Sequence, residues 1–428
     1  MIMMFAIPLM LGNIFQQLYN LADSKIVSAY VGTEAFAAVG ATSVVAIVMI
    51  GFLNGLTQGF AVPIANSFGA KDYKRMKKNV AGTICLTIVF SLVFTVVSML
   101  FIKDILVLLN TPDDIMNDAV DYVKIILIGI SFTALYNMCA NVLRAVGDSR
   151  TPLYCLMISV CLNVGLDLLF VKVFGWGIQG AAIATVLAQA LSGLFCLGYI
   201  LTSFREILPE KESWRIEGAL YLELITSGLS MALMSCVVHI GTVVLQSAIN
   251  SLGTAIVTAH TAARRIFDVL VVILNSVGVA MTTYVSQNMG AGKYDRVRQG
   301  IRQAFLIVSG MTTFLIILCY LEAEPVLQWI VSGNEPEIIE AAVMYCKISL
   351  AFFYVLGPLF ILRCSLQGMG RKIIPICSSV LEMVIKVLSA NFLVPAFAYV
   401  GVAYTEPISW CAMTLLLAVA YLVKKPGV

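Results

Sequence analysis

Charged residues are scarce in this sequence, and histidine is nearly absent. Asp, Glu, Lys and Arg together make up 12% of the 428 residues, and there are two histidines. Hydrophobic residues make up 60%, and the mean hydropathy is +0.95. A soluble globular domain carries about twice this share of charged residues, so the composition excludes that class and indicates a membrane protein.

The sequence also lacks the residue spacings that mark metal and redox sites. Its eleven cysteines form no C-x-x-C pair, and His239 and His260 lie far apart with no ligand spacing around them. Thiols scattered through apolar segments are usually buried core residues, and isolated histidines are usually hydrogen-bonded within the core. We therefore predict no cofactor and no structural metal.

Apolar runs recur along nearly the whole chain, separated by short polar or Gly/Pro-marked breaks. A run of about 20 to 30 residues is long enough to cross the roughly 30 Å hydrocarbon core of a bilayer as a helix. The sequence thus predicts an all-α polytopic membrane protein with about twelve transmembrane helices. Their expected ranges are 5–30, 36–66, 80–109, 117–146, 151–174, 178–203, 219–250, 254–289, 300–321, 340–369, 374–396 and 401–423.

The two halves of the chain repeat one another. Residues 32–80 match 253–301 at an offset of 221, and LRAVGDSRTP (143–152) matches LQGMGRKIIP (366–375) at an offset of 223. Each half holds about six spans, and an even number returns the chain to the side on which it started. The two lobes are therefore expected to form a parallel repeat about a pseudo-two-fold axis. We expect an N-terminal lobe over 1–203, a cytoplasmic linker over 204–218 and a C-terminal lobe over 219–428.

Lys and Arg are unevenly distributed among the connectors. Most of them follow the even-numbered spans or lie at the C-terminus, whereas the alternate connectors are short or acidic. The positive-inside rule assigns the basic connectors, and with them both termini, to the cytoplasm. This topology accounts for the net charge of +3 without a nucleic-acid partner.

Two acids lie inside predicted spans of the first half. Asp23 follows Tyr19 by one helical turn, and Asp167 follows Asn163 by one turn, so each acid shares a helix face with a polar residue. A charge at bilayer depth costs about 3 kcal/mol or more and usually marks an ion or substrate pathway. Two simpler interpretations stay open: Asp23 is a solvated interfacial residue beside Lys25, and Asp167 has only a structural role.

The second half does not repeat these acids. By the repeat offsets, Asp23 and Asp167 correspond to Val244 and Ala390. A proton or cation site is therefore predicted for the first half alone. Opposite charges spaced four residues apart in the second half, which are expected to neutralise each other, are Glu382 with Lys386 and Arg264 with Asp268.

Several motifs follow one another along the chain in a characteristic order. They are IPLMLGNIFQQLYNLADSKIV, two basic G-A-x-x-Y-x-R loops, LRAVGDSRTP, and LNVGLDLLFV followed by GIQGAAIATVLAQ. With the duplication, they resemble the multidrug and toxic compound extrusion (MATE) transporters, and in particular their DinF-type bacterial branch. The resemblance implies a monomer in the bacterial cytoplasmic membrane, with two six-helix lobes and a central cleft that opens alternately to either side. It further implies export of cationic or amphipathic small molecules in exchange for H⁺ or Na⁺.

The resemblance also implies roles for single residues. In the DinF-type branch the coupling ion binds in the first lobe, and that pattern falls on Tyr19, Asp23, Asn163, Asp167 and Thr185. H⁺ and Na⁺ are both candidates for the ion at the two acids. Packing between helices is an alternative role for Asn137, Asn141 and Thr185. Residues expected to line the substrate cavity are Gln16, Tyr136, Asn137, Met138 and Gln189, and Pro8 is expected to mark a bend in the first helix.

Three other functions fit parts of the sequence. A flippase for lipid-linked precursors, from the same superfamily, would be expected to line its cavity with basic residues, whereas the first lobe offers acids. A prenyltransferase-like enzyme would hold Mg²⁺ on the carboxylates of NDAVD (117–121). That segment is predicted on the extracytoplasmic side and has no second acidic motif. A passive channel would give no reason for two repeated lobes. From these comparisons we predict a secondary active exporter and not an enzyme.

Overall fold

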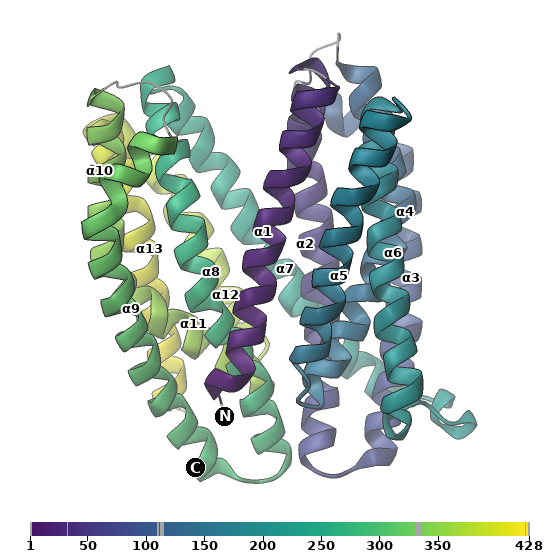
Figure 1. Cartoon of the computed structure of the whole chain (residues 1–428). Coiled ribbons are helices and arrows are strands. Elements are labelled where there is room, and N and C mark those ends of the chain that lie inside the picture. The colour runs from purple at the N-terminus through teal and green to yellow at the C-terminus, as the bar shows by residue number, and fades with distance from the viewer. Residues whose placement is uncertain are drawn as a thin grey trace. The chain divides into compact units, whose positions relative to one another are not determined.

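All the regular secondary structure in the residues that the computed structural model describes is helical (Figure 1). These residues are 2–31, 33–108, 111, 115–330, 336–423 and 425–426. The first half contains α1 (Ile2–Tyr30), α2 (Thr33–Gly69), α3 (Tyr73–Leu108), α4 (Met116–Ala145), α5 (Arg150–Asp167) and α6 (Gly177–Ser203). The second half contains α7 (Gly218–Asn250), α8 (Thr254–Gly290), α9 (Tyr294–Ile330), α10 (Pro336–Ala351), α11 (Phe353–Gly368), α12 (Ile373–Leu388) and α13 (Val394–Val423).

The helices account for twelve membrane spans, as the sequence predicts. Among the described residues, ten helical segments are long and apolar enough to cross a bilayer, and a bent pair makes eleven. One of the ten, Ile373–Val423, has 51 residues. A straight helix of that length would measure about 77 Å, more than twice the thickness of the hydrocarbon core. It contains α12 and α13, which pack against each other, and the backbone leaves the helical conformation at Ala398, so this segment supplies two spans.

The predicted span 340–369 is broken and not continuous. α10 and α11 meet at Phe352 with a bend of 53°. Pro358 follows in α11, and proline has no N–H to donate to the carbonyl of Tyr354, which its ring also crowds. The corresponding helix of the first half, α4, is unbroken over 30 residues. The two halves therefore differ in this span.

The sequence repeat is also a repeat of backbone hydrogen bonds. After α2, the Asp72 N–H donates to the Ser67 carbonyl at 3.0 Å, and at the equivalent place after α8 the Lys293 N–H donates to the Asn288 carbonyl at 2.9 Å. A left-handed residue closes each of these helix ends, as is common at helix C-termini. The second matched pair of bonds joins Asp148 to Leu143 after α4 and Arg371 to Leu366 after α11, each at 2.9 Å.

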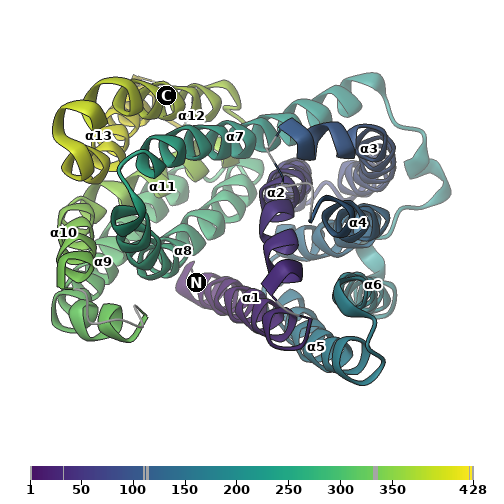
Figure 2. The ribbon, with the colours of Figure 1, turned by 90° about the horizontal axis from the view of Figure 1, so that it is seen from above.

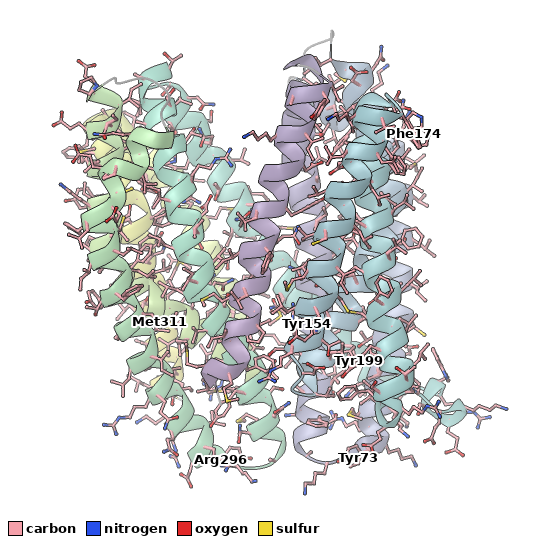
Figure 3. The ribbon with its side chains drawn as sticks, viewed as in Figure 1. Tyr73, Tyr154, Phe174, Tyr199, Arg296 and Met311 are labelled. Atoms are coloured by element: carbon pink, nitrogen blue, oxygen red, sulfur yellow. The ribbon has the colours of Figure 1, made fainter. Side chains whose placement is uncertain are left out.

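Aromatic side chains mark the two ends of the first half. Phe170 stacks on both Phe174 and Trp176, which are tilted against each other, and the ring centroids lie between 4.9 and 6.0 Å apart. Tyr199 packs against Phe204 with a centroid distance of 5.8 Å, and Figure 3 shows Phe174 and Tyr199 toward opposite ends of the helices. Aromatic residues gather at both membrane–water interfaces, so these clusters are consistent with the predicted spans.

The chain divides into two compact units. The first unit is Ile7–Ala232, and the second is Met1–Ala6 together with Leu233–Val428. In the first unit α4 is central: it packs on α2, α3, α5 and α6, and Figure 2 shows it between α3 and α6. In the second unit α8 packs on α9, α10 and α11, and α13 packs on α10, α11 and α12.

The division between the units lies inside α7, beyond the linker at 204–218 that separates the sequence repeats. The first half of α7 packs tightly on α2. A Cβ atom added at Gly59 would lie 2.3 Å from the Ser227 carbonyl oxygen, and one at Gly55 would lie 2.8 Å from that of Met231. Glycine permits this approach because it has no side chain. The first turns of α7 are therefore part of the packing of the first unit.

Candidate functional site

Helices α1, α5 and α6 of the first unit bring the predicted coupling residues together. The Tyr19 hydroxyl on α1 lies 3.2 Å from Thr185 Oγ1 on α6. With its amide oriented to suit its neighbours, Asn163 on α5 donates from Nδ2 to Asp167 Oδ2 at 2.8 Å and accepts from the Thr185 N–H at 3.2 Å. α1 thus meets two helices that are remote from it in sequence, α5 and α6, in one polar network.

The carboxyl groups of Asp23 and Asp167 face each other in this network. They are within hydrogen-bonding reach of each other, and the Oδ1 atom of each is buried without a conventional hydrogen-bond partner. Asp167 is fully buried. None of the ion pairs formed by the described residues includes either acid. Two ionised carboxylates this close repel each other, so this arrangement is stable only with a proton or a cation between them.

A narrow crevice runs beside the network. It encloses about 180 Å³ but is too narrow for a water molecule. Two of the predicted cavity residues, Gln16 and Gln189, therefore lie next to Tyr19 and Asn163. The side chains that line the crevice are Gln16, Tyr19, Leu156, Ser159, Val160, Asn163, Ala188 and Gln189.

The other predicted cavity residues lie on α4 and do not line this crevice. Tyr136 and Met138 are buried in a packed hydrophobic cluster, and the Tyr136 hydroxyl donates to the Pro152 carbonyl at 3.2 Å. Asn137 is partly exposed. The role of these three side chains in a substrate cavity stays a prediction. Pro8 lies within α1, which is one helix from Ile2 to Tyr30, and the bend expected there also stays a prediction.

The sequence does not predict two features of the site. Tyr122 on α4 is buried and lies within electrostatic range of Tyr19, Asp23 and Asp167, although no helical spacing links it to them. Directly after Asp167 the chain forms a π-helical turn, Leu168–Val173. The second half has a π-helical turn, Ser389–Leu393, in the matching region. Such turns are frequent at functional sites, and here the turn adjoins the acid pair only in the first half.

The second unit holds two charge clusters, one buried and one partly exposed. Both ion pairs predicted from i, i+4 spacing are present, at 2.9 Å and 2.7 Å. Each gains a third member from another helix, which the spacing does not reveal. Every acid in these clusters lies within 3.5 Å of a cation, unlike Asp23 and Asp167. The clusters are Arg363–Glu382–Lys386 and Arg264–Asp268–Glu406.

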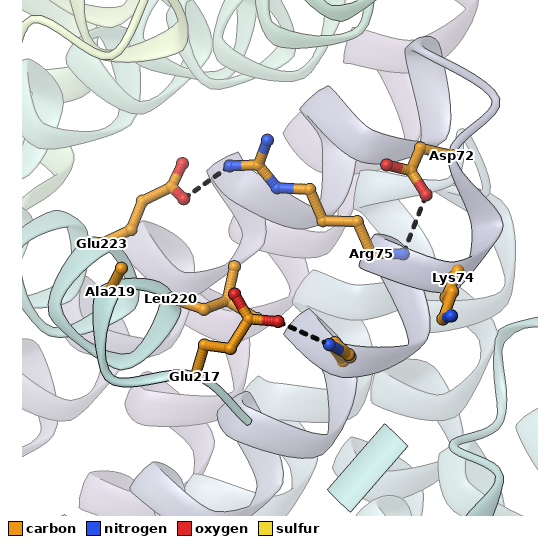
Figure 4. Close-up of a pocket in the computed structure, with 8 residues that line it drawn as sticks. Asp72, Lys74, Arg75, Glu217, Ala219, Leu220 and Glu223 are labelled. Carbon is orange, nitrogen blue, oxygen red and sulfur yellow. Dashed lines mark hydrogen bonds and ion pairs between the residues drawn. The ribbon is translucent and has the colours of Figure 1, made fainter. Parts of the chain in front are cut away.

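Ion pairs fasten the linker and the start of α7 to the basic end of the first unit. They join Arg75 to Glu223 at 2.7 Å, Lys78 to Glu217 at 2.9 Å, and Lys77 to Glu210. Figure 4 shows the Arg75–Glu223 pair and the position of Glu217. Hydrogen bonds from the lysines, and their charge, lower the pKa of Glu210 and Glu217. Exposed pairs of this kind contribute little to stability one by one, but together they restrict where the linker lies.

Two repeated sets of membrane-spanning helices with a buried polar network define a polytopic membrane protein, and its family is one of transporters and not of enzymes. The MatE family model matches residues 8–169 and 230–392, once in each half. The chain belongs to the MatE family, which agrees with the resemblance of its motifs.

The chain is similar to two proteins of Bacillus subtilis (strain 168). It is 26% identical over 384 residues to Probable multidrug resistance protein YoeA, a match that covers 88% of this chain and 82% of the relative. It is 29% identical over 377 residues to Probable multidrug resistance protein YpnP, with 87% and 83% covered. A crystal structure of MATE in the bent conformation matches with a TM-score of 0.89 at 21% identity, covering 99% of this chain and 95% of that chain. This structural match shows the shared fold.

Proposed function

We propose that the protein is a secondary active exporter that exchanges cationic or amphipathic small molecules for H⁺ or Na⁺ by alternating access. The names of YoeA and YpnP support drug-like substrates. In this proposal the protein works as a monomer in the bacterial cytoplasmic membrane. Its basic connectors and both termini lie in the cytoplasm, in agreement with the positive-inside rule.

The observation that carries the proposal is the pair of facing acids in the first unit. Asp23 and Asp167 have no basic partner among the described residues, so one proton or one Na⁺ is needed to neutralise their mutual repulsion. Tyr19, Asn163 and Thr185 supply hydrogen bonds or oxygen ligands around that position. Carboxylate oxygens at the membrane midplane commonly hold coupling ions in transporters.

Ion binding is expected to change how α1 packs on α5. With the ion bound, Asp23 on α1 stays close to Asp167 on α5. Without it, repulsion between the two carboxylates favours a state in which the helices move apart. Coupling then requires only that the ion and the substrate prefer different states. We expect the ion-bound form to release substrate on the outer side.

The site favours the DinF-type branch of the family over the sodium-coupled branch that resembles NorM. The family resemblance implies that the NorM-type branch uses acids on the seventh and tenth spans of the chain. The buried acids of the second unit here, Glu382 and Glu406, lie on α12 and α13 and pair with cations. Among the buried acids of the described residues, Glu382 and Glu406 are paired with cations, whereas Asp167, which faces Asp23, forms no ion pair.

Efflux from proteoliposomes under separately imposed H⁺ and Na⁺ gradients tests this function. Vesicles loaded with a fluorescent cationic dye should export it against its own gradient when one of the two ion gradients is present. Vesicles with the Asp23→Asn/Asp167→Asn protein serve as the control. Dye movement that needs no ion gradient would indicate a channel, and movement of lipid-linked precursors alone would indicate a flippase.

A further inference from the structure

The second unit contains a buried cluster with one positive charge in excess. Arg363 on α11 lies 3.5 Å from Glu382 Oε2 on α12, and Lys386 Nζ lies 2.9 Å from Glu382 Oε1. The side chains of Arg363 and Glu382 are each 9% exposed, and that of Lys386 is 3% exposed. Two cations around one carboxylate leave a formal charge of +1 inside the membrane-spanning helices.

The other groups found around the cluster do not neutralise this charge. Lys386 Nζ also donates to Thr242 Oγ1 on α7 at 3.2 Å, and the Arg363 guanidinium reaches Met413 Sδ on α13 at 4.0 Å. Both partners are uncharged. His239, one turn before Thr242, lies within electrostatic range but carries either no charge or a positive one. An unmatched charge at this depth is costly, so a negative partner would stabilise it.

Arg363 also has an unused donor. Its Nε is buried and has no hydrogen-bond partner, whereas buried polar groups normally have one. The planar guanidinium offers parallel N–H groups that match the two oxygens of a carboxylate. A carboxylate carries a single negative charge, which equals the excess on the cluster, whereas a phosphate dianion would exceed it.

We propose that Arg363 and Lys386 bind a carboxylate group of the transported molecule. Glu382, which lies between the two cations, fixes their positions. The inference rests on the proposed export function and names a substrate class: amphipathic molecules that bear a carboxylate. The cluster is closed in this conformation, because α7 packs on α12 beside it. A Cβ atom at Gly241 would lie 3.2 Å from Lys386 Cδ. Binding is expected in the state in which these two helices separate.

A matched pair of dyes tests the inference: a rhodamine with a free carboxylate and its ethyl ester. Lys386→Met leaves a neutral Arg363–Glu382 pair, and Arg363→Gln leaves a neutral Glu382–Lys386 pair, so both variants should fold. Fluorescence anisotropy with the purified full chain should show the free acid binding at least about tenfold more weakly to either variant, as expected when a hydrogen bond between charged groups is lost. Ester binding should not change. Lys347→Met, which removes an exposed cation from α10, is the control and should bind both dyes like the wild type.

Three other outcomes of these measurements would contradict the inference. Equal loss of acid and ester binding would assign the cluster a structural role, and unchanged acid binding would show that it does not meet the carboxylate. Stabilisation of the wild type by vesicles containing phosphatidylglycerol, without any effect of the dye carboxylate, would assign the cluster to a lipid headgroup. If the wild type exports neither dye under either ion gradient, the proposed function fails, and the anisotropy measurement still decides the inference.

Discussion

The two acids of the first-unit site have different surroundings. Asp167 is fully buried and accepts a hydrogen bond from Asn163, whereas Asp23 is only partly buried. Asp167 is therefore held in a fixed position by its own helix. Asp23 is the acid through which a proton or Na⁺ is expected to enter the site.

An amide at either position should abolish ion-coupled efflux. Asp23→Asn and Asp167→Asn keep the side-chain shape but remove the carboxylate, so the protein should fold and insert while gradient-driven efflux falls to the level of protein-free vesicles. Asn163→Ala should cause a milder loss. Asp121→Asn, an exposed acid on α4, is the matched control and should keep full activity. Normal drug resistance in cells that express either acid variant at wild-type levels would contradict this prediction.

Removing Glu382 should harm the second unit more than removing Lys386. Glu382→Gln leaves Arg363 and Lys386 as two unmatched cations, whereas Lys386→Met leaves a neutral pair. Breaking a buried ion pair costs about 3–5 kcal/mol, so the melting temperature in detergent should fall strongly for Glu382→Gln and only slightly for Lys386→Met. The Glu382→Gln/Lys386→Met double variant leaves one unmatched cation, Arg363, and its melting temperature should lie between those of the two single variants. Equal melting temperatures for the three variants would show that the charge count does not govern stability.

Sequence spacing reveals neighbours on one helix but not neighbours across helices. It predicts the faces shared by Tyr19 with Asp23 and by Asn163 with Asp167, because residues four apart lie one turn away from each other. The convergence of these faces on Thr185 is implied by the family resemblance. Tyr122 and Arg363 approach their sites from other helices, and no local pattern encodes such contacts. Because the spacing does not reveal Arg363, the sequence alone predicts that removing Glu382 and Lys386 together would destabilise the protein less than removing either one.

Among the elements, the contact between α2 and α7 depends on glycine. Gly59→Ala would place a Cβ atom 2.3 Å from the Ser227 carbonyl oxygen, so the helices would have to move apart. Overpacking of this kind costs about 1–3 kcal/mol, which should lower the melting temperature of the purified protein. Gly198→Ala on α6, where no atom lies within 4 Å of the added Cβ, is the control. If both variants melt like the wild type, this contact does not limit stability.

Hydrophobic runs predict that a helix exists better than they predict where it breaks. The apolar segments give the twelve spans because each must satisfy its backbone hydrogen bonds within the bilayer. The hydrophobic pattern does not predict the bend between α10 and α11, because the residues on both sides of the bend are apolar and Pro358 lies after it. The π-helical turns after Asp167 and within Ser389–Leu393 likewise change the hydrogen bonding without changing the hydrophobicity.

At the scale of the whole molecule, the parallel repeat fixes which connectors share a side of the membrane. Cysteines introduced at Lys74 and Arg296, in a background with the native cysteines replaced, should react only with reagents that reach the cytoplasm. Cysteines at Asp118 and Glu337 should react from outside, because they follow odd-numbered spans. The sequence predicts the same labelling from outside at Asp114 and Glu335, which lie outside the described residues. Reaction of the Lys74 and Arg296 positions from opposite sides would mean an inverted repeat.

The central claim is that Asp23 and Asp167 couple ion binding to substrate binding. Calorimetric titration of the purified protein with substrate, repeated in buffers of different ionisation enthalpy and at several Na⁺ concentrations, measures how many ions leave when substrate binds. The account predicts net release of one H⁺ or one Na⁺ per substrate in the wild type and none in Asp23→Asn/Asp167→Asn, with substrate binding retained. Equal ion release from the wild type and the double variant would contradict it.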